Sequence, residues 1–346
     1  MGELKDGSVH LTVTSSPYPM IALWDELFTN QNPAIETALE KGDGTRAFEL
    51  MHQELDRVWD EIYRVLKPGG IACINIGDAT RTINNNFQLF SNHARILSHC
   101  LQIGFQSLPE IIWRKQTNAP NKFMGSGMLP PGAYVTLEHE FILILRKGRK
   151  REFKNSEEKA NRKQSSYFWE ERNTWFSDVW DFKGIEQKLD NEKTRERSAA
   201  YPFELAYRLI NMFSVKGDIV LDPFLGTGTT MIAAMCVGRN SVGYELDSNL
   251  LDTILLRVQT AVEYSNKYIQ NRLKNHLNFV SERLKAGKPL KYVNAHYGFP
   301  VVTKQETDLV FYDLKRIAPL DDHQFEVIYN ENPQFHFENN IVKSNP

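Results

Sequence analysis

Cysteines and long apolar runs are both scarce in this chain. Its 346 residues contain three cysteines, and Cys73, Cys100 and Cys236 lie far apart without a Cys-x-x-Cys or Cys/His spacing. We therefore expect no disulfide framework and no metal, and interpret the three thiols as core residues. No run approaches the roughly 18 apolar residues needed to span a bilayer, and residues 1–10 lack the basic and apolar regions of a signal peptide. These absences favour a soluble cytoplasmic protein without a membrane partner.

A large net charge of either sign is missing as well. The formal net charge is −2, so binding to a polyanion has to come from a local basic surface. Residues 146–163 provide such a stretch, with nine Lys or Arg and three Glu. This composition is as typical of a solvated linker as of a phosphate-binding surface. Trp169, Trp175 and Trp180 follow, and we interpret them as core anchors in preference to base-stacking platforms.

Apolar periodicity predicts alternating helices and strands. In the first half we expect a strand over 8–14, a helix over 45–66, a strand over 71–76, a helix over 87–103 and strands over 107–114 and 139–146. In the second half we expect helices over 202–213, 229–237 and 250–284, with strands over 218–221 and 241–244. This alternation indicates an α/β fold with a mostly parallel sheet. Asp78, which follows one of the strands, is interpreted as a cap of the next helix.

A glycine loop joins the strand at 218–221 to the helix at 229–237. Its glycines let the backbone approach a ligand closely, and the helix that begins at Thr229 can receive an anionic group at its N-terminus. Glu245 ends the next strand, where a carboxylate can accept hydrogen bonds from both hydroxyls of a ribose. Met231 stands where the third glycine of G-x-G-x-x-G would be, which disfavours dinucleotide binding. A nucleoside-type cofactor and a plain tight turn both stay open on this loop alone.

Two motifs together carry a resemblance to a known family. The string Asp222-Pro223-Phe224-x-Gly226-x-Gly228-Thr229-Thr230 resembles the S-adenosylmethionine-binding motif of DNA amino-methyltransferases. The string Thr14-Ser15-Ser16-Pro17-Tyr18-Pro19 resembles their S-P-P-Y motif, with Ser16 in place of its first proline. Because the catalytic loop precedes the cofactor loop, the chain resembles the permuted β class of N4-cytosine and N6-adenine methyltransferases. The resemblance implies a Rossmann-like methyltransferase fold, with a mixed sheet and helices on both faces, a small recognition region and a C-terminal appendage.

The resemblance also implies roles for particular residues. Ser15, through its hydroxyl, and Ser16, through its main-chain carbonyl, would accept hydrogen bonds from the target amine, while Tyr18 would stack on a flipped base and Pro17 would stiffen the turn. S-adenosylmethionine would be held by Asp222, Pro223, Phe224, Gly226, Gly228, Thr229, Thr230, Glu245, Leu246 and Pro202. DNA would be contacted by Arg146, Lys147, Arg149, Lys150, Arg151 and Lys122.

Four parts follow from this resemblance. They are the catalytic half at 1–146, a basic target-recognition region at 147–195, the cofactor-binding half at 196–287 and a C-terminal appendage at 288–346. The implied host is bacterial or archaeal, with the enzyme at the nucleoid.

The implied activity is site-specific methylation of cytosine N4 in double-stranded DNA, by base flipping and direct in-line transfer. A restriction endonuclease that acts on the same site is the implied partner. Serine at the first motif position favours cytosine, whereas aspartate or asparagine is commoner for adenine, so N6-adenine methylation is the alternative. None of the cysteines follows a proline, which argues against a cytosine C5 mechanism. An RNA or protein amide methyltransferase, and an inactive DNA-binding protein that retained the fold, also stay open.

Overall fold

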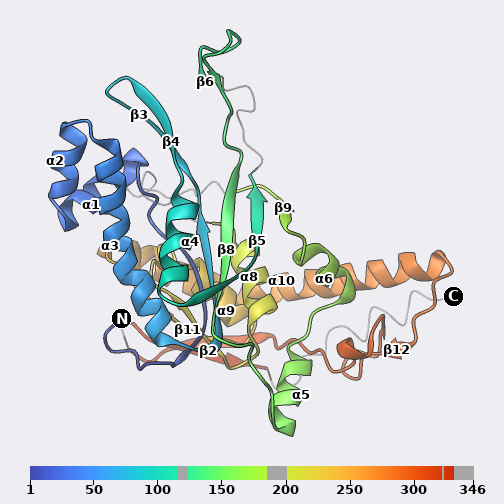
Figure 1. Cartoon of the computed structure of the whole chain (residues 1–346). Coiled ribbons are helices and arrows are strands. Elements are labelled where there is room, and N and C mark those ends of the chain that lie inside the picture. Colours follow the sequence, from blue (N-terminus) through green and yellow to red (C-terminus); the bar gives the residue numbers. More distant parts are fainter. Residues whose placement is uncertain (116–123, 185–200, 322, 331–346) are drawn as a thin grey trace. The chain divides into compact units, whose positions relative to one another are not determined.

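The computed structural model describes residues 1–115, 124–184, 201–321 and 323–330 (Figure 1). These residues form two compact units. Unit 1 is built from 1–8, 12–150 and 177–202, and unit 2 from 9–11, 151–176 and 203 onward. Among the described helices, none combines the length and the apolar character that a bilayer span requires.

Unit 1 is organised around a mixed sheet. Its principal strands are β1 (Val9–Ser15), whose last four residues belong to this unit, β2 (Leu66–Ile76), β5 (Phe105–Arg114), β8 (His139–Lys147) and β9 (Val179–Asp181). β8 pairs antiparallel with both β2 and β5, whereas β9 pairs parallel with β5. β2, β5 and β9 therefore run parallel to one another and β8 alone runs against them, so these strands show the expected mostly parallel sheet with one antiparallel member. The described residues between β5 and β8 contain no crossover helix, and β8 runs antiparallel to both of its neighbours.

The helices of unit 1 are α1 (Asp25–Gln31), α2 (Ala34–Glu40), α3 (Gly44–Val65) and α4 (Asn92–Gln102), and a short η1 (Ala22–Trp24) precedes them. α3 confirms the helix predicted at 45–66, and Asp43 caps it by accepting a hydrogen bond from the Arg46 amide at 2.9 Å. Both long helices cover the sheet. Tyr63 of α3 meets Phe105 edge-on at 4.9 Å, and His93 of α4 stacks on Phe141 of β8 at 3.7 Å between ring centroids.

Two hairpins extend beyond this sheet in Figure 1. They are β3 (Ala79–Ile83) with β4 (Asn86–Phe90), and β6 (Met124–Gly125) with β7 (Ala133–Tyr134). The helix predicted from residue 87 begins only at Asn92, because residues 86–90 pair with β3 instead. Asn84 and Asn85 make the turn with φ of 48° and 59°, a left-handed conformation that asparagine tolerates better than most residues.

Unit 2 contains the predicted βαβ segment. β10 (Ile219–Asp222) and β11 (Asn240–Gly243) pair in parallel, and α9 (Thr229–Cys236) connects them. The first residues of β1 join this unit, and the Ile219 amide donates to Nδ1 of His10 at 3.0 Å. The other helices are α5 (Ser156–Gln164), α6 (Trp169–Trp175), α8 (Phe203–Phe213) and α10 (Leu251–Lys285), with the short η2 (Ser248–Leu250) and η3 (Lys304–Glu306). Positions of the helices and strands predicted for this half are confirmed to within a few residues.

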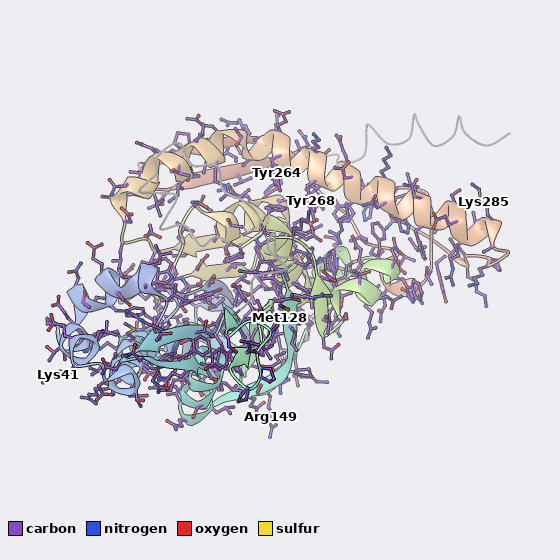
Figure 2. The ribbon with its side chains drawn as sticks, turned by 90° about the horizontal axis from the view of Figure 1, so that it is seen from above. Lys41, Met128, Arg149, Tyr264, Tyr268 and Lys285 are labelled. Carbon is purple, nitrogen blue, oxygen red and sulfur yellow. The ribbon has the colours of Figure 1, made fainter. Side chains whose placement is uncertain are left out.

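α10 begins at Leu251, shortly after β11, and runs through unit 2 to its last residue, Lys285, which Figure 2 labels. Tyr264 and Tyr268 of α10 pack against Phe203 of α8, with ring centroids 4.8 and 5.0 Å apart. The segment after α10 forms two hairpins, β12 (Tyr292–Val293) with β13 (Pro300–Val301) and β14 (Leu314–Pro319) with β15 (Phe325–Tyr329). Tyr329 donates to the carbonyl of Met235 in α9 at 2.6 Å, so this segment is part of unit 2.

All three cysteines are buried and free, which confirms them as core thiols. Burial raises the pKa of each thiol, and that of Cys236 to about 12. Trp175 and Trp180 are also buried, as predicted, whereas Trp169 is 37% exposed.

Candidate active site

A connected group of polar side chains lies where β1 ends in unit 1. We call it the Tyr18 cluster, and its members are Ser15, Tyr18, Asn75, Lys115 and Glu140. Tyr18 OH lies 3.2 Å from Ser15 Oγ and donates to Glu140 Oε2 at 2.9 Å. The amide nitrogen of Asn75 lies 2.7 Å from the same carboxylate oxygen and 2.9 Å from Tyr18 OH. Lys115 forms an ion pair with the other oxygen of Glu140.

The hydroxyl of Tyr18 therefore points into the protein. Burial and the negative charge of Glu140 raise the pKa of Tyr18 well above its ordinary value, so the phenol keeps its proton. Gly77 lies against the ring, because a Cβ at that position would come within 2.9 Å of Tyr18 Cε2 and 3.3 Å of Glu140 Cγ. Glycine at this strand end is what allows Tyr18 and Glu140 to approach each other.

Three members of the cluster, Asn75, Lys115 and Glu140, were not among the residues selected from the sequence. Asn75 stands at the end of β2, and Glu140 at the beginning of the antiparallel β8. A polar residue near a strand end is a weak signal in itself, and the position of β8 beside β2 was not predictable from periodicity. The structure brings both residues to the Ser-Ser-Pro-Tyr loop because β8 runs back along β2.

A second set of contacts, made by the side chain of Asn92, holds the Ser-Ser-Pro-Tyr loop in place. The Asn92 side chain donates to the carbonyls of Pro19 at 3.1 Å and Gly77 at 3.0 Å, and its oxygen lies 3.0 Å from Nε2 of His52. Burial lowers the pKa of His52 to about 4, so this imidazole is neutral at neutral pH. Asp78 is not the N-cap of the next helix, because strand β3 follows it and Ser91 is the N-cap of α4. Its carboxylate nevertheless accepts a hydrogen bond from the His93 amide at 3.1 Å in the first turn of α4.

The middle of the loop is closed to solvent. Ser16 and Pro17 are both buried. Ser16 Oγ has no hydrogen-bond partner in the described part of the chain.

The cofactor loop of unit 2 connects β10 to α9. Gly226 and Gly228 have φ of 53° and 80°, where a side chain would be strained. The exposed Glu245 closes the loop, since one carboxylate oxygen accepts from the Gly226 amide at 2.7 Å and the other from the Asp247 amide at 2.8 Å. Asp222 is buried and accepts from the Phe224 amide at 3.1 Å.

This loop has the properties that a nucleoside cofactor requires. A Cβ built on Gly226 would meet only one atom within 4 Å, so the space beside the loop is open. A carboxylate has about four acceptor positions, and only two at Glu245 are used by the protein amides. Gly228 is the N-cap of α9, and a helix N-terminus of this kind can receive an anionic group.

The remaining cofactor candidates differ in their surroundings. Thr229 Oγ1 lies 3.1 Å from the guanidinium of Arg257, and Thr230 is buried. Leu246 is 84% exposed. Pro202 is buried directly before α8, within unit 1.

The basic stretch divides into paired and unpaired side chains. Arg146 donates to Gln106 at 2.7 Å, Lys147 to the carbonyl of Tyr63 at 2.6 Å, and Arg151 pairs with Asp218 at 2.6 Å. In contrast, Arg149 and Lys150 are exposed and make no hydrogen bond or ion pair with a described residue. Lys122 lies outside the described residues.

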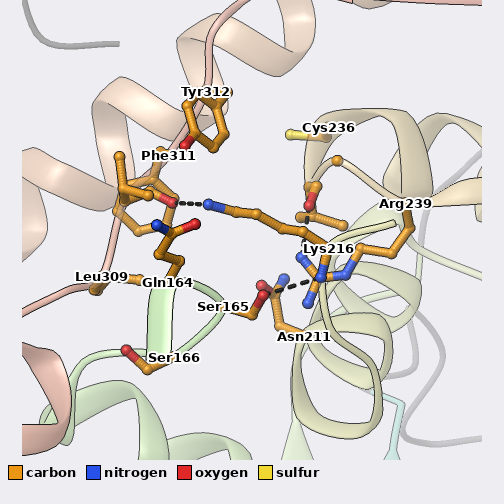
Figure 3. A pocket seen from close by; sticks show the side chains of 13 residues that line it. Gln164, Ser165, Ser166, Asn211, Lys216, Cys236, Arg239, Leu309, Phe311 and Tyr312 are labelled. Carbon is orange, nitrogen blue, oxygen red and sulfur yellow. Dashed lines mark hydrogen bonds between the residues drawn. The ribbon is translucent and has the colours of Figure 1, made fainter. Parts of the chain in front are cut away.

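A small cavity in unit 2 is separate from the cofactor loop (Figure 3). Lys216 lies along it and donates to the carbonyl of Val310 at 2.5 Å, with its ammonium 4.3 Å from the ring centroid of Tyr312. The Lys216 main chain binds α5, because its amide donates to Ser165 Oγ at 2.9 Å. Lys216 therefore connects the cofactor half to α5 and to the C-terminal segment. In the described ranges, no group of three or more His, Cys, Asp or Glu is arranged to hold a metal ion.

Comparison with known proteins identifies relatives over most of the chain. The DNA methylase family matches residues 9–256. Type II methyltransferase M.MthZI of Methanothermobacter thermautotrophicus is 54% identical over 337 residues, or 96% of this chain and 94% of that protein. Type II methyltransferase M.MjaI of Methanocaldococcus jannaschii is 53% identical over 261 residues, or 72% and 85%. The solved structure of TTHA0409, a DNA modification methylase from Thermus thermophilus complexed with S-adenosyl-L-methionine, matches with a TM-score of 0.57 and 33% identity, covering 74% of this chain and 87% of that one.

An α/β fold with a glycine loop, an acidic strand end and a Ser-Ser-Pro-Tyr loop defines the class of methyltransferases that act on amino groups of DNA. The chain belongs to the DNA methylase family of N6 and N4 methyltransferases, and its relatives are Type II enzymes. The family and the mixed α/β methyltransferase fold predicted from the sequence are confirmed.

Proposed function

We propose that the protein transfers a methyl group to the exocyclic N4 of cytosine at a specific site in double-stranded DNA. The observation that carries the proposal is Ser15, which occupies the first position of the catalytic motif and lies 3.2 Å from Tyr18 OH. Serine at this position supports cytosine, since the resemblance associates aspartate or asparagine with adenine. N6-adenine methylation at the same site is the alternative.

The cofactor is S-adenosylmethionine, which supplies an electrophilic methyl group on its sulfonium. Glu245 would accept hydrogen bonds from its ribose hydroxyls, because the carboxylate is exposed and keeps unused acceptor positions. The amides at the start of α9, with Thr229 or Thr230, would bind its carboxylate. Apolar packing against its adenine would come from Pro223, Phe224 and Leu246, with Asp222, Gly226, Gly228 and Pro202 shaping the pocket.

The residues of the catalytic loop would prepare the target amine. Its lone pair is delocalised into the base, so the nitrogen has to become pyramidal before it can attack the methyl group. Ser15 Oγ and the Ser16 carbonyl would each accept one N–H of the amine and hold it in that geometry. A serine hydroxyl is too weakly basic to remove the proton, which would leave to water after direct in-line transfer. The ring of Tyr18 would stack on the flipped base while Pro17 stiffens the loop.

DNA binding would involve the basic stretch. We propose Arg149 and Lys150 as its phosphate contacts, because both are exposed and without an ionic partner among the described residues. Arg146, Lys147 and Arg151 would support this surface through their internal contacts, and Lys122, outside the described residues, stays a predicted DNA contact. The Type II relatives support a restriction endonuclease of the same specificity as a partner in a bacterial or archaeal host. The four-part organisation with recognition at 147–195 stays a prediction.

The test is direct identification of the methylated base. Purified protein would be incubated with S-adenosylmethionine and unmethylated DNA of mixed sequence, and the DNA digested to nucleosides for mass spectrometry. We expect N4-methylcytosine, with loss of the product in Ser15→Ala and retention in Ser107→Ala, an exposed serine on β5. N6-methyladenine would overturn the choice of base. Absence of any methylated base from a protein that binds S-adenosylmethionine would overturn DNA methylation itself.

A further inference from the structure

We propose that Glu140 is a positioning residue that sets the direction of the hydrogen bond between Ser15 and Tyr18. It thereby makes Ser15 an acceptor towards the substrate, which selects bases that present an amino group. This inference rests on the proposed function.

The carboxylate of Glu140 is placed to control the proton of Tyr18. Glu140 is 7% exposed at the start of β8, and the Lys115 ammonium pairs with its Oε1. Its Oε2 accepts from Tyr18 OH at 2.9 Å and from Asn75 at 2.7 Å. A carboxylate can only accept hydrogen bonds, so the single phenolic proton of Tyr18 points to Glu140.

The remaining hydrogen-bond directions follow from counting protons. The Asn75 amide nitrogen, 2.9 Å from Tyr18 OH, is a donor and cannot accept a proton from it. Burial and the charge of Glu140 raise the pKa of Tyr18, so the phenol does not gain acceptor capacity by ionising. With the Tyr18 proton already used, the 3.2 Å contact to Ser15 is a hydrogen bond only if Ser15 donates.

Ser15 then presents lone pairs to the substrate and no proton. One side of its Oγ faces the Asn75 amide nitrogen at 3.4 Å, and the partly exposed side remains for the target. Cytosine N4 and adenine N6 donate hydrogen bonds, whereas thymine O4 and guanine O6 accept them. An acceptor at Ser15 therefore matches amino bases and leaves an oxo group facing another acceptor. If Tyr18 instead donated to Ser15, the Ser15 proton would point towards the substrate amine, and two hydrogen-bond donors would face each other.

The first experiment uses Glu140→Gln in the full chain. Glutamine keeps the size of the side chain, but its NH₂ can donate to the Tyr18 oxygen and release the phenolic proton towards Ser15. We expect kcat to fall by about tenfold or more, with KM for DNA and Kd for S-adenosylmethionine within about twofold of wild type. Glu138→Gln is the matched control, because it makes the same change two residues away in an exposed ion pair with Arg114.

A double-mutant cycle with Tyr18→Phe tests whether Glu140 acts through Tyr18. Phenylalanine keeps the ring for stacking but removes the acceptor for the Ser15 proton, so kcat should fall in this variant alone. In the Tyr18→Phe background, Glu140→Gln should lower kcat by at most about a further twofold, because the hydrogen bond between Tyr18 and Ser15 is already absent.

An equal loss of kcat from Glu140→Gln in the wild-type and Tyr18→Phe backgrounds would overturn the proposal. Wild-type kcat in either single variant would also overturn it. Thermal melting and cofactor binding identify misfolded samples, and if Glu140→Gln does not fold, wild-type kcat in Tyr18→Phe still overturns the proposal. Wild-type protein that methylates no base contradicts the proposed function, whereas an active wild type with unaffected variants contradicts only this inference.

Discussion

Lys216 provides a quantitative test of the packing in unit 2. Its side-chain amine lies along the cavity of Figure 3, where burial and the nearby charges of Arg239 and Arg272 lower its pKa to about 6. In an unfolded chain a lysine has a pKa of about 10.4. Between these values the unfolded state holds a proton that the folded state lacks, so unfolding takes up a proton. The free energy of unfolding should therefore rise with pH, by up to about 1.4 kcal/mol per unit, from about pH 6 upward.

The perturbation is Lys216→Met, which keeps a long unbranched side chain and removes the titrating group. Between pH 6.5 and 8.5, the wild type should gain up to about 3 kcal/mol relative to the variant. Urea unfolding at a series of pH values measures this difference, and Lys274→Met, on an exposed part of α10, is the matched control. If wild type and Lys216→Met change in parallel over this range, the amine is charged in the folded protein and the reasoning fails.

Three further predictions concern the two functional loops and the basic stretch. Glu245→Gln should weaken S-adenosylmethionine binding by about 30-fold, corresponding to about 2 kcal/mol for charged hydrogen bonds, measured by calorimetry; an unchanged Kd would contradict the ribose role. Ser16→Ala should leave methylation intact and raise stability by about 1 kcal/mol, since it removes a buried hydroxyl without a partner in the described chain; lost activity with retained folding would assign a role to that hydroxyl. Neutralising Arg149 and Lys150 together should reduce the slope of log K for DNA against log salt by up to about 2, and an unchanged slope would place DNA elsewhere.

The segment of β10, α9 and β11 was predictable because its signals are local. The glycine loop lies between a short apolar strand and a helix, and Glu245 follows at the end of the next strand, all within about thirty residues. Each inference needed only neighbouring residues, and the structure confirms the β10, α9 and β11 positions closely. The antiparallel course of β8 could not be obtained in this way. Helix and strand periods carry no information on which strands become neighbours.

The hairpin of β3 and β4 was missed for a different reason. Residues 87–103 contain apolar side chains at intervals that a helix also uses, so the period did not separate residues 86–90 from the helix that follows. The signal that could have corrected the prediction is the turn chemistry of Asn84 and Asn85, which both adopt positive φ. For a short apolar segment, the adjoining turn residues should be examined before the spacing of its apolar side chains is used to predict a helix or a strand.

The Tyr18 cluster shows why a candidate site built from distant residues is harder to predict than a local glycine loop. A Ser-Pro-Tyr string identifies the hydroxyls, but the direction of a hydrogen bond depends on what each hydroxyl meets, and here that is Glu140, 122 residues away along the chain. Its approach needs β8 antiparallel to β2 and a glycine at position 77. Both are consequences of the fold and not of the motif. In the arrangement we propose, Glu140 takes the Tyr18 proton and Ser15 turns its lone pairs to the substrate, so a preference for an amine would depend on the assembled sheet and not on the motif alone.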